Sequence, residues 1–318
     1  GKTTFSFDDS ALYFKGLEIA NPPTEPVDLQ TGDEFRYTFR MRPATVLRPP
    51  VNPDNLSKFP QQHQRVVKQL RELGAIVISN EAGGDARSAI TLSQFWQGSV
   101  EDLELLTELH RLLDVYVTTF PYPEPLRKKM PNPQSPEVTD AWLDVIGRCP
   151  ELHTLHVARS RITDRGLGYL SEHETLASLY LHDSVVQGSG LEVLPKSLSD
   201  LYIKAPLTDL EAVDLSAHQE LRSLYLYSSA DKPLAIPKLP VNLWNLGLTL
   251  SNDSNWQKIR ALKKLVVLQI QGASVDDQVI PKLDQWKLRA ISLFDTSISE
   301  QGVQELREAD RQRTITVQ

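Results

Sequence analysis

The sequence predicts an α/β fold, a solenoid in which short strand–turn–helix units stack one on another. The pattern L-x-x-L-x-L recurs in seven successive copies, which start at Leu152, Leu176, Leu198, Leu221, Leu243, Leu265 and Leu288. The steps between them are 22 to 24 residues, and a period in the twenties is typical of solenoids. In each copy the apolar residues first alternate, as on one face of a strand, and then recur at helical spacing. Because such a unit cannot cover its own apolar face, the units have to stack.

The clearest copy is LHTLHVARSRITDRGLGYL at 152–170. Leu155 and Val157 alternate in its first half, and a helical spacing follows in its second half. Two other copies, LPKSLSDLYI at 194–203 and LPVNLWNLGL at 239–248, contain prolines. Proline lacks the N–H that a helix interior needs, so an extended segment or a single turn is expected there instead of a helix.

The N-terminal end of the repeats has its own elements. Residues 60–73 carry apolar residues at helical spacing and predict a helix that caps the stack. Two weaker copies follow, LGAIVI from Leu73 and RSAITL from Arg87, only 14 residues apart. That short step predicts a hairpin around 81–85, where glycines permit positive φ angles.

The remaining segments interrupt or flank the repeats. A further copy starts at Leu112 and is followed by a Pro-rich insertion at 120–137, which is either a tolerated surface insertion or a binding loop. Residues 314–317 alternate like a closing strand. Residues 1–59 lack the repeat, and alternating stretches such as 34–41 predict a short β segment with a Pro-rich linker before a repeat domain at 60–318.

The repeats resemble the leucine-rich repeat family. The form ITDxGLxxL at 162–170, with partial matches at 138–146 and 297–306, is similar to the subtype of F-box-associated repeats and of bacterial, planctomycete-type proteins. The two proline-containing copies are closer to the LPxxL repeats of bacterial effectors. The resemblance covers 60–318 and implies a right-handed coil with a parallel sheet on the concave face and helices or turns on the convex face. It is specific for the fold and says little about function.

Two polar features recur beside the apolar pattern. A small or hydroxyl residue follows the last apolar residue of most strands by three positions: Ser160, Ser184, Ser229, Ser251, Ala273 and Thr296. A hydroxyl in such a turn is expected to bond backbone groups that the strands leave unpaired. Asp140 and Asp164 follow a threonine at the start of the helical part, where we expect them to cap the convex helices rather than to act as bases.

Aromatic residues occupy the strand positions that point away from the core on the concave side. Tyrosine supplies a large contact area with a polar tip, so these positions predict a surface that binds a partner. Cross-strand packing of the same rings would also stabilise the sheet, and the two interpretations are compatible. The predicted partner-binding residues are Tyr116, His156, Tyr180, His182, Tyr202, Lys204, Tyr225 and Tyr227.

Composition and motifs exclude several other classes of protein. The net charge of −7 gives no basic stripe for nucleic acid, and no apolar run is long enough to span a membrane. A single cysteine, Cys149, excludes an internal disulfide and a multi-cysteine metal site, and we expect it to be buried. GKTT at 1–4 lacks the preceding strand and glycine of a phosphate-binding loop. The histidines lack metal-ligand spacing, and Cys149 is not followed by the x-Asp of catalytic effectors, so no enzyme, metal or cofactor is predicted.

The function predicted from these observations is a non-catalytic interaction module that binds a protein or peptide through its concave face. The alternative is a structural or assembly protein of an envelope or compartment, with contacts through its ends or its N-terminal segment. A start at Gly1 rather than Met is compatible with a removed export signal or lipid anchor, or with a residue introduced by cloning. The compartment, the partner and the oligomeric state stay open at this point.

Overall fold

The computed structural model describes residues 56–82, 85–93, 95–118, 137–208, 210–229 and 232–317, the stretches 80–82 and 85–86 as backbone only. Backbone alone also defines four short strands near the N-terminus. These are β1 (Thr3–Phe5), β2 (Leu17–Ile19), β3 (Val27–Leu29) and β4 (Met41–Pro43), in the antiparallel pairs β1–β3 and β2–β4. The rest of segment 1–59 before Leu56, and the insertion predicted at 120–137 up to residue 136, lie outside the described residues. The division into domains 1–59 and 60–318 stays a prediction.

An 11-stranded sheet runs through the repeats, and its strands lie side by side in the order of the chain. The first two strands, β5 (Ile76–Ala82) and β6 (Asp85–Leu92), form an antiparallel hairpin, which confirms the hairpin predicted around 81–85. Every later strand pairs in parallel with its predecessor. These strands are β7 (Leu112–Val117), β8 (Thr154–Ala158), β9 (Ser178–His182), β10 (Asp200–Ala205), β11 (Ser223–Ser228), β12 (Asn245–Thr249), β13 (Val267–Gln271), β14 (Ala290–Phe294) and β15 (Thr314–Val317).

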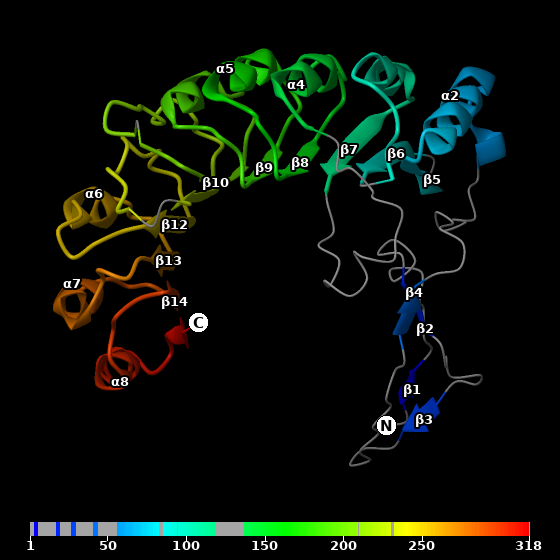
Figure 1. Ribbon diagram of the computed structural model, residues 1–318. Coiled ribbons are helices and arrows are strands. Elements are labelled where there is room, and N and C mark those ends of the chain that lie inside the picture. The colour runs from blue at the N-terminus through cyan, green and yellow to red at the C-terminus, as the bar shows by residue number, and fades with distance from the viewer. Residues whose placement is uncertain are drawn as a thin grey trace.

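Helices and turns return the chain from one strand to the next on the outer side of the arc, and the strands line its inner side (Figure 1). The α-helices are α2 (Gln61–Glu72), α4 (Asp140–Ile146), α5 (Asp164–Leu167), α6 (Trp256–Arg260), α7 (Ile280–Leu283) and α8 (Glu300–Ala309). Short 3-10 helices lie at η1 (Leu56–Lys58), η2 (Glu101–Glu108), η3 (Gly168–Leu170), η4 (Ser189–Val193) and η5 (Asp277–Val279). The predicted leucine-rich repeat solenoid, with its sheet on the concave face, is confirmed.

The two proline-containing copies lack an α-helix, as the sequence predicts. Only the single turn η4 precedes Pro195, and the described residues between β11 and β12, which include Pro240, contain no helix. The described part of 206–222, between β10 and β11, also lacks a helix, which the sequence did not predict. Leu207, Leu210 and Val213 are nonetheless buried there, so an irregular turn fills the same space as a helix does elsewhere.

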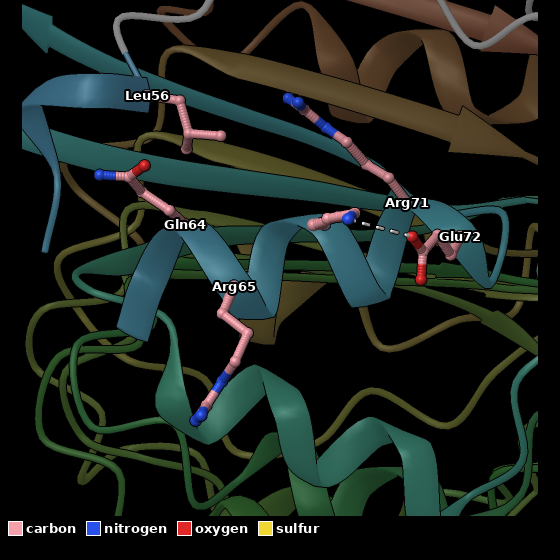
Figure 2. A pocket seen from close by; sticks show the side chains of 6 residues that line it. Leu56, Gln64, Arg65, Arg71 and Glu72 are labelled. Atoms are coloured by element: carbon pink, nitrogen blue, oxygen red, sulfur yellow. Dashed lines mark ion pairs between the residues drawn. The ribbon is translucent and has the colours of Figure 1, made fainter. Parts of the chain in front are cut away.

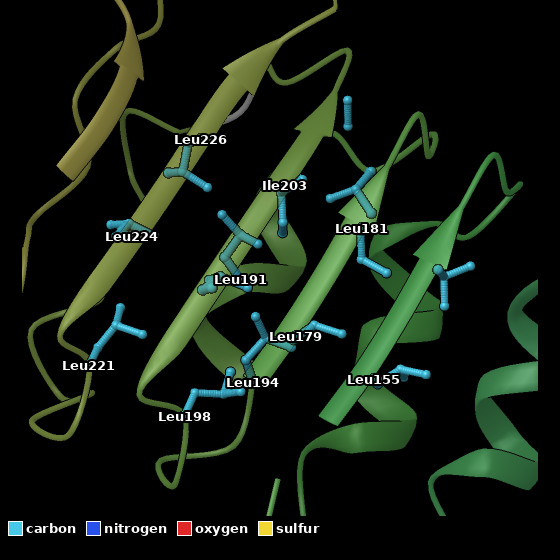
Figure 3. Close-up of a cluster of buried hydrophobic side chains, with 14 of the residues drawn as sticks. Leu155, Leu179, Leu181, Leu191, Leu194, Leu198, Ile203, Leu221, Leu224 and Leu226 are labelled. Atoms are coloured by element: carbon cyan, nitrogen blue, oxygen red, sulfur yellow. The ribbon is translucent and has the colours of Figure 1, made fainter. Parts of the chain in front are cut away.

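The core is a column of leucine-like side chains between the sheet and the outer turns. Figure 3 shows Leu179 and Leu181 pointing from β9 toward Leu191 and Leu194 of the following turn. Parallel pairing keeps the strand leucines in register, since Leu155 lies opposite Leu179 and Leu179 opposite Leu201. Each fully buried leucine contributes about 1.5–3 kcal/mol to folding. The leucines of the pattern L-x-x-L-x-L are therefore the side chains on the buried face of each strand.

Helix α2 closes the N-terminal end of this core. Val66, Val67 and Leu70 are fully buried on one of its faces, and the helix contacts β5 and η2. The range 60–73 thus contains a helix, as the spacing predicts. At the other end, β15 confirms the predicted closing strand at 314–317. No helix in the described part of the chain has the length and apolar character needed to cross a membrane.

The predicted helix-capping role of Asp140 and Asp164 is wrong. Neither carboxylate caps its own helix; each accepts hydrogen bonds from the next repeat instead. Asp140 accepts from the backbone N–H of Thr163 (2.8 Å) and from its hydroxyl (2.6 Å). Asp164 accepts from three backbone N–H groups, and Asp277 repeats the Asp140 arrangement with Ser299 at 2.8 and 2.7 Å. The turn of each following repeat begins beside the carboxylate and brings N–H groups that need an acceptor. We call these three carboxylates the carboxylate ladder.

The expected role of the recurring hydroxyls is also wrong at two positions. Ser160 and Ser184 are buried, but their hydroxyl oxygens have no hydrogen-bond partner among the described residues. Ala273 stands at the same repeat position without a hydroxyl. The turn therefore selects a small side chain for packing, and the hydroxyl group is not what it requires.

Candidate interaction surface

The outward side chains of the concave sheet form the row that the sequence predicts. Because side chains alternate along a strand, the residue between two buried leucines faces away from the core. Parallel pairing then places these residues opposite one another on five adjacent strands. The row runs Tyr116, His156, Tyr180, Tyr202 and Tyr225. It continues without aromatic residues through Gly247, Gln269 and Ser292.

The rings of this row contact one another from β7 to β11. The centroid separations are 6.1 Å for Tyr116–His156, 5.8 Å for His156–Tyr180, 6.5 Å for Tyr180–Tyr202 and 6.2 Å for Tyr202–Tyr225. A second row, two residues further along each strand, adds His182 and Tyr227. His182 stacks on Tyr202 at 4.3 Å, and Tyr227 lies 5.7 Å from Tyr202. We call these seven residues the aromatic band.

The aromatic band is accessible except at its C-terminal end. Its members are half-buried, as is the predicted residue Lys204, whereas Tyr227 is only 6% exposed. The Tyr227 hydroxyl donates a hydrogen bond of 2.8 Å to Gln269 Oε1. Tyr227 therefore packs beneath the exposed rings of the aromatic band and has little surface that a partner could contact.

Gly247 makes this arrangement possible, a role that was not predicted from the sequence. A Cβ atom on Gly247 would overlap the Tyr227 hydroxyl and the ring of Tyr225. Both rings thus lie over the bare backbone of β12. A glycine inside a strand commonly marks such a close approach, so this signal was present in the sequence.

Burial determines the charge state of the aromatic band. It lowers the pKa of His156, and the neighbouring His182 lowers it further. Burial also lowers the pKa of His182, with Lys204 acting in the same direction and Asp183 opposing. Burial raises the pKa of the tyrosines in the band. At neutral pH these rings are uncharged, and the surface combines apolar faces with polar tips.

Two other histidines and the cysteine contact the backbone or the core and do not face the concave surface. Nε2 of His173 lies 2.8 Å from the Cys149 carbonyl, and Nε2 of His218 lies 3.0 Å from the Leu194 carbonyl, each bond joining adjacent repeats. Cys149 is buried, as predicted, and burial raises the pKa of its thiol to about 12. Among the described residues, no three His, Cys, Asp or Glu side chains lie close enough to hold a metal ion.

A groove along α2 at the N-terminal end is a weaker candidate. Figure 2 shows Leu56, Gln64, Arg65, Arg71 and Glu72 around it. Two of its cations already have partners. Lys68 pairs with Glu72 at 3.9 Å, and Arg71 donates to the Val77 carbonyl at 2.6 Å.

The repeats, the parallel concave sheet and the convex turns define a protein with the leucine-rich repeat fold. No family model matches the sequence, and no curated protein matches it either. Among solved structures, the chain is similar to the crystal structure of an internalin (InlF) from Listeria monocytogenes, with 12% identity and a TM-score of 0.28. That match covers 83% of this chain and 95% of the internalin chain. At this level of similarity nothing about function is transferred.

Proposed function

We propose that this protein is a non-catalytic interaction module that binds a protein or peptide partner through its concave face. The observation that carries the proposal is the aromatic band, an unbroken series of ring contacts across five adjacent strands. Tyrosine is enriched at protein interfaces because it combines a large apolar face with a hydrogen-bonding tip. Rings already held by their neighbours lose little further freedom when a partner binds.

The proposed contacts are the half-buried residues of the concave rows. They are Tyr116, His156, Tyr180, His182, Tyr202, Lys204 and Tyr225, with Tyr227 holding Tyr202 and Tyr225 in place from below. Tyr202 lies at the centre, since its ring contacts those of Tyr180, His182, Tyr225 and Tyr227. Binding energy usually concentrates near the centre of an interface, so Tyr202 is the proposed main contact.

A structural or assembly role remains the second candidate. In that role the rings only strengthen the sheet, by about 0.2–1 kcal/mol per cross-strand pair. The contacts with other molecules would then involve the ends of the solenoid or residues 1–59.

From the ITDxGLxxL copies we further infer a bacterial protein of the planctomycete-type or F-box-like subtype.

A peptide-display selection on the intact protein tests the concave-face proposal. Peptides selected on the wild type would be titrated against the double variant Tyr202→Ala/Tyr225→Ala. Loss of two central aromatic contacts should weaken binding by roughly thirtyfold, equivalent to about 2 kcal/mol. The matched control is Ser292→Ala/Thr316→Ala, which changes the same row beyond the aromatic band. Unchanged affinity of every selected peptide in a double variant with native circular dichroism would contradict the proposal and favour the structural role.

A further inference from the structure

A groove of about 320 Å³ lies at the turns that lead into β13 and β14. Its apolar lining consists of Ile259, Leu262, Leu265, Trp286 and Leu288. Each of these side chains is at most 9% exposed, so the lining forms the outer surface of the core itself. This groove is separate from the aromatic band, which ends at β11.

Three cations surround the apolar lining: Arg260, Lys263 and Lys287. None of their side chains has a hydrogen bond or ion pair with any residue that the structure describes. This differs from the groove on α2, where Lys68 and Arg71 are engaged. In a chain with a net charge of −7, three cations around one groove, without partners in the described part of the chain, form a local site of opposite sign.

The surface beside the groove is unusually apolar for an exposed turn. Val241 and Trp244, in the turn before β12, are 61% and 54% exposed. This turn lies next to the groove because Lys264 donates to Asn242 Oδ1 at 2.7 Å. The other tryptophans, at 96, 142, 256 and 286, are at most 9% exposed. Exposed large apolar residues bordered by polar ones mark interaction sites.

We propose that this groove binds an acidic peptide segment of a partner that carries one large apolar side chain. The apolar side chain would cover Leu262, Leu265 and Trp286. The flanking carboxylates would pair with Arg260, Lys263 and Lys287. The volume is at the small end of the range for ligand pockets, which suits a single side chain rather than a larger ligand.

The distribution of charge on the protein favours a short acidic peptide over a long polyanion as the ligand of this groove. At physiological salt, charges more than about 8 Å apart are largely screened, so a short peptide experiences mainly the local cations. A nucleic acid or an anionic bilayer extends beyond the groove. There it would meet the acidic remainder of the surface, which opposes binding.

A titration with a defined probe tests this proposal on the full chain. The probe is a fluorescein-labelled, glutamate-rich peptide with a central Leu-Phe pair, followed by fluorescence anisotropy. We expect saturable binding that weakens as salt increases. In Lys263→Glu/Lys287→Glu the affinity should decrease by about tenfold or more, because two attractions become two repulsions. Lys196→Glu, at the equivalent place before β10, is the matched control and should bind like the wild type.

The remaining arms use the same assay. A peptide with glutamine in place of glutamate should bind weakly, and the Tyr202→Ala/Tyr225→Ala variant should bind the acidic peptide as the wild type does. No binding at about 1 mM peptide would overturn the proposal. So would equal affinity for the glutamine peptide, or unchanged affinity in the Lys263→Glu/Lys287→Glu variant. Binding of phosphatidylserine vesicles but not of the peptide would overturn it in favour of a membrane surface.

Discussion

Replacing Asp164 by alanine should destabilise the contact between two repeats on the convex side. The Asp164 carboxylate accepts three backbone hydrogen bonds from the next repeat. Its Oδ1 accepts from Gly188 (2.8 Å) and Gly190 (2.7 Å), and its Oδ2 accepts from Gln187 (2.7 Å). Alanine removes all three of these hydrogen bonds between α5 and the turn that contains the start of η4.

The magnitude follows from which of these N–H groups water can reach. Gln187 is exposed, so water replaces its lost acceptor. Gly188 and Gly190 are buried, and their N–H groups would be left without a partner. A buried donor without an acceptor costs about 1–3 kcal/mol, so the two together should lower the free energy of unfolding of Asp164→Ala by roughly 2–6 kcal/mol.

Asparagine separates the hydrogen bonds from the other effects of the substitution. In Asp164→Asn the carbonyl oxygen can keep both buried bonds, and the amide group faces the exposed Gln187 N–H. We therefore expect a loss of about 1 kcal/mol or less. Urea denaturation followed by circular dichroism measures both variants, with the exposed neighbour Arg165→Ala as the control. If Asp164→Ala unfolds within about 0.5 kcal/mol of Arg165→Ala, the carboxylate ladder does not stabilise the stack as argued.

Two further predictions concern the aromatic band. Gly247→Ala should lower the free energy of unfolding by about 1–3 kcal/mol, because the new methyl displaces the rings of Tyr225 and Tyr227. The same displacement should change the near-ultraviolet circular dichroism. A variant with the wild-type melting temperature and spectrum would refute this prediction. The pKa of both His156 and His182 is lowered in the folded state, so the unfolded state binds more protons at mildly acidic pH. Their contribution to stability is complete above about pH 6.5 and is lost as the pH falls through the lowered values. His156→Gln/His182→Gln should therefore lose less unfolding free energy than the wild type between about pH 7.5 and pH 5.5, and equal losses in urea titrations would count against the argument.

The repeat positions could be predicted from the sequence because two periodicities agree. Alternation gives the buried side of each strand, and the 22–24-residue step gives the register between strands. These two periodicities together place Tyr180 opposite Tyr202. The capping helix and the hairpin were predictable from local spacing, which does not depend on the rest of the fold.

Contacts between specific groups of neighbouring repeats were not predictable in the same way. Asp164 looks like a helix cap when its own repeat is considered alone. Its actual partners are 23 to 26 residues later, in a turn whose path depends on η4. The burial of Tyr227 likewise depends on the missing side chain of Gly247 and on Gln269, one and two strands away.

The groove before β13 and β14 shows what the sequence could have yielded if every repeat position had been compared across copies. In a solenoid, equivalent residues of consecutive copies are neighbours in space, on the turns as well as on the strands. Lys263 precedes Leu265 by two residues and Lys287 precedes Leu288 by one, so the two lysines stand at adjacent repeat positions of consecutive copies. Along the chain they are ordinary solvated lysines, more than twenty residues apart. Once the copies are stacked they surround the same apolar lining, so the chemistry of a repeat surface lies in its columns and not in its linear motifs.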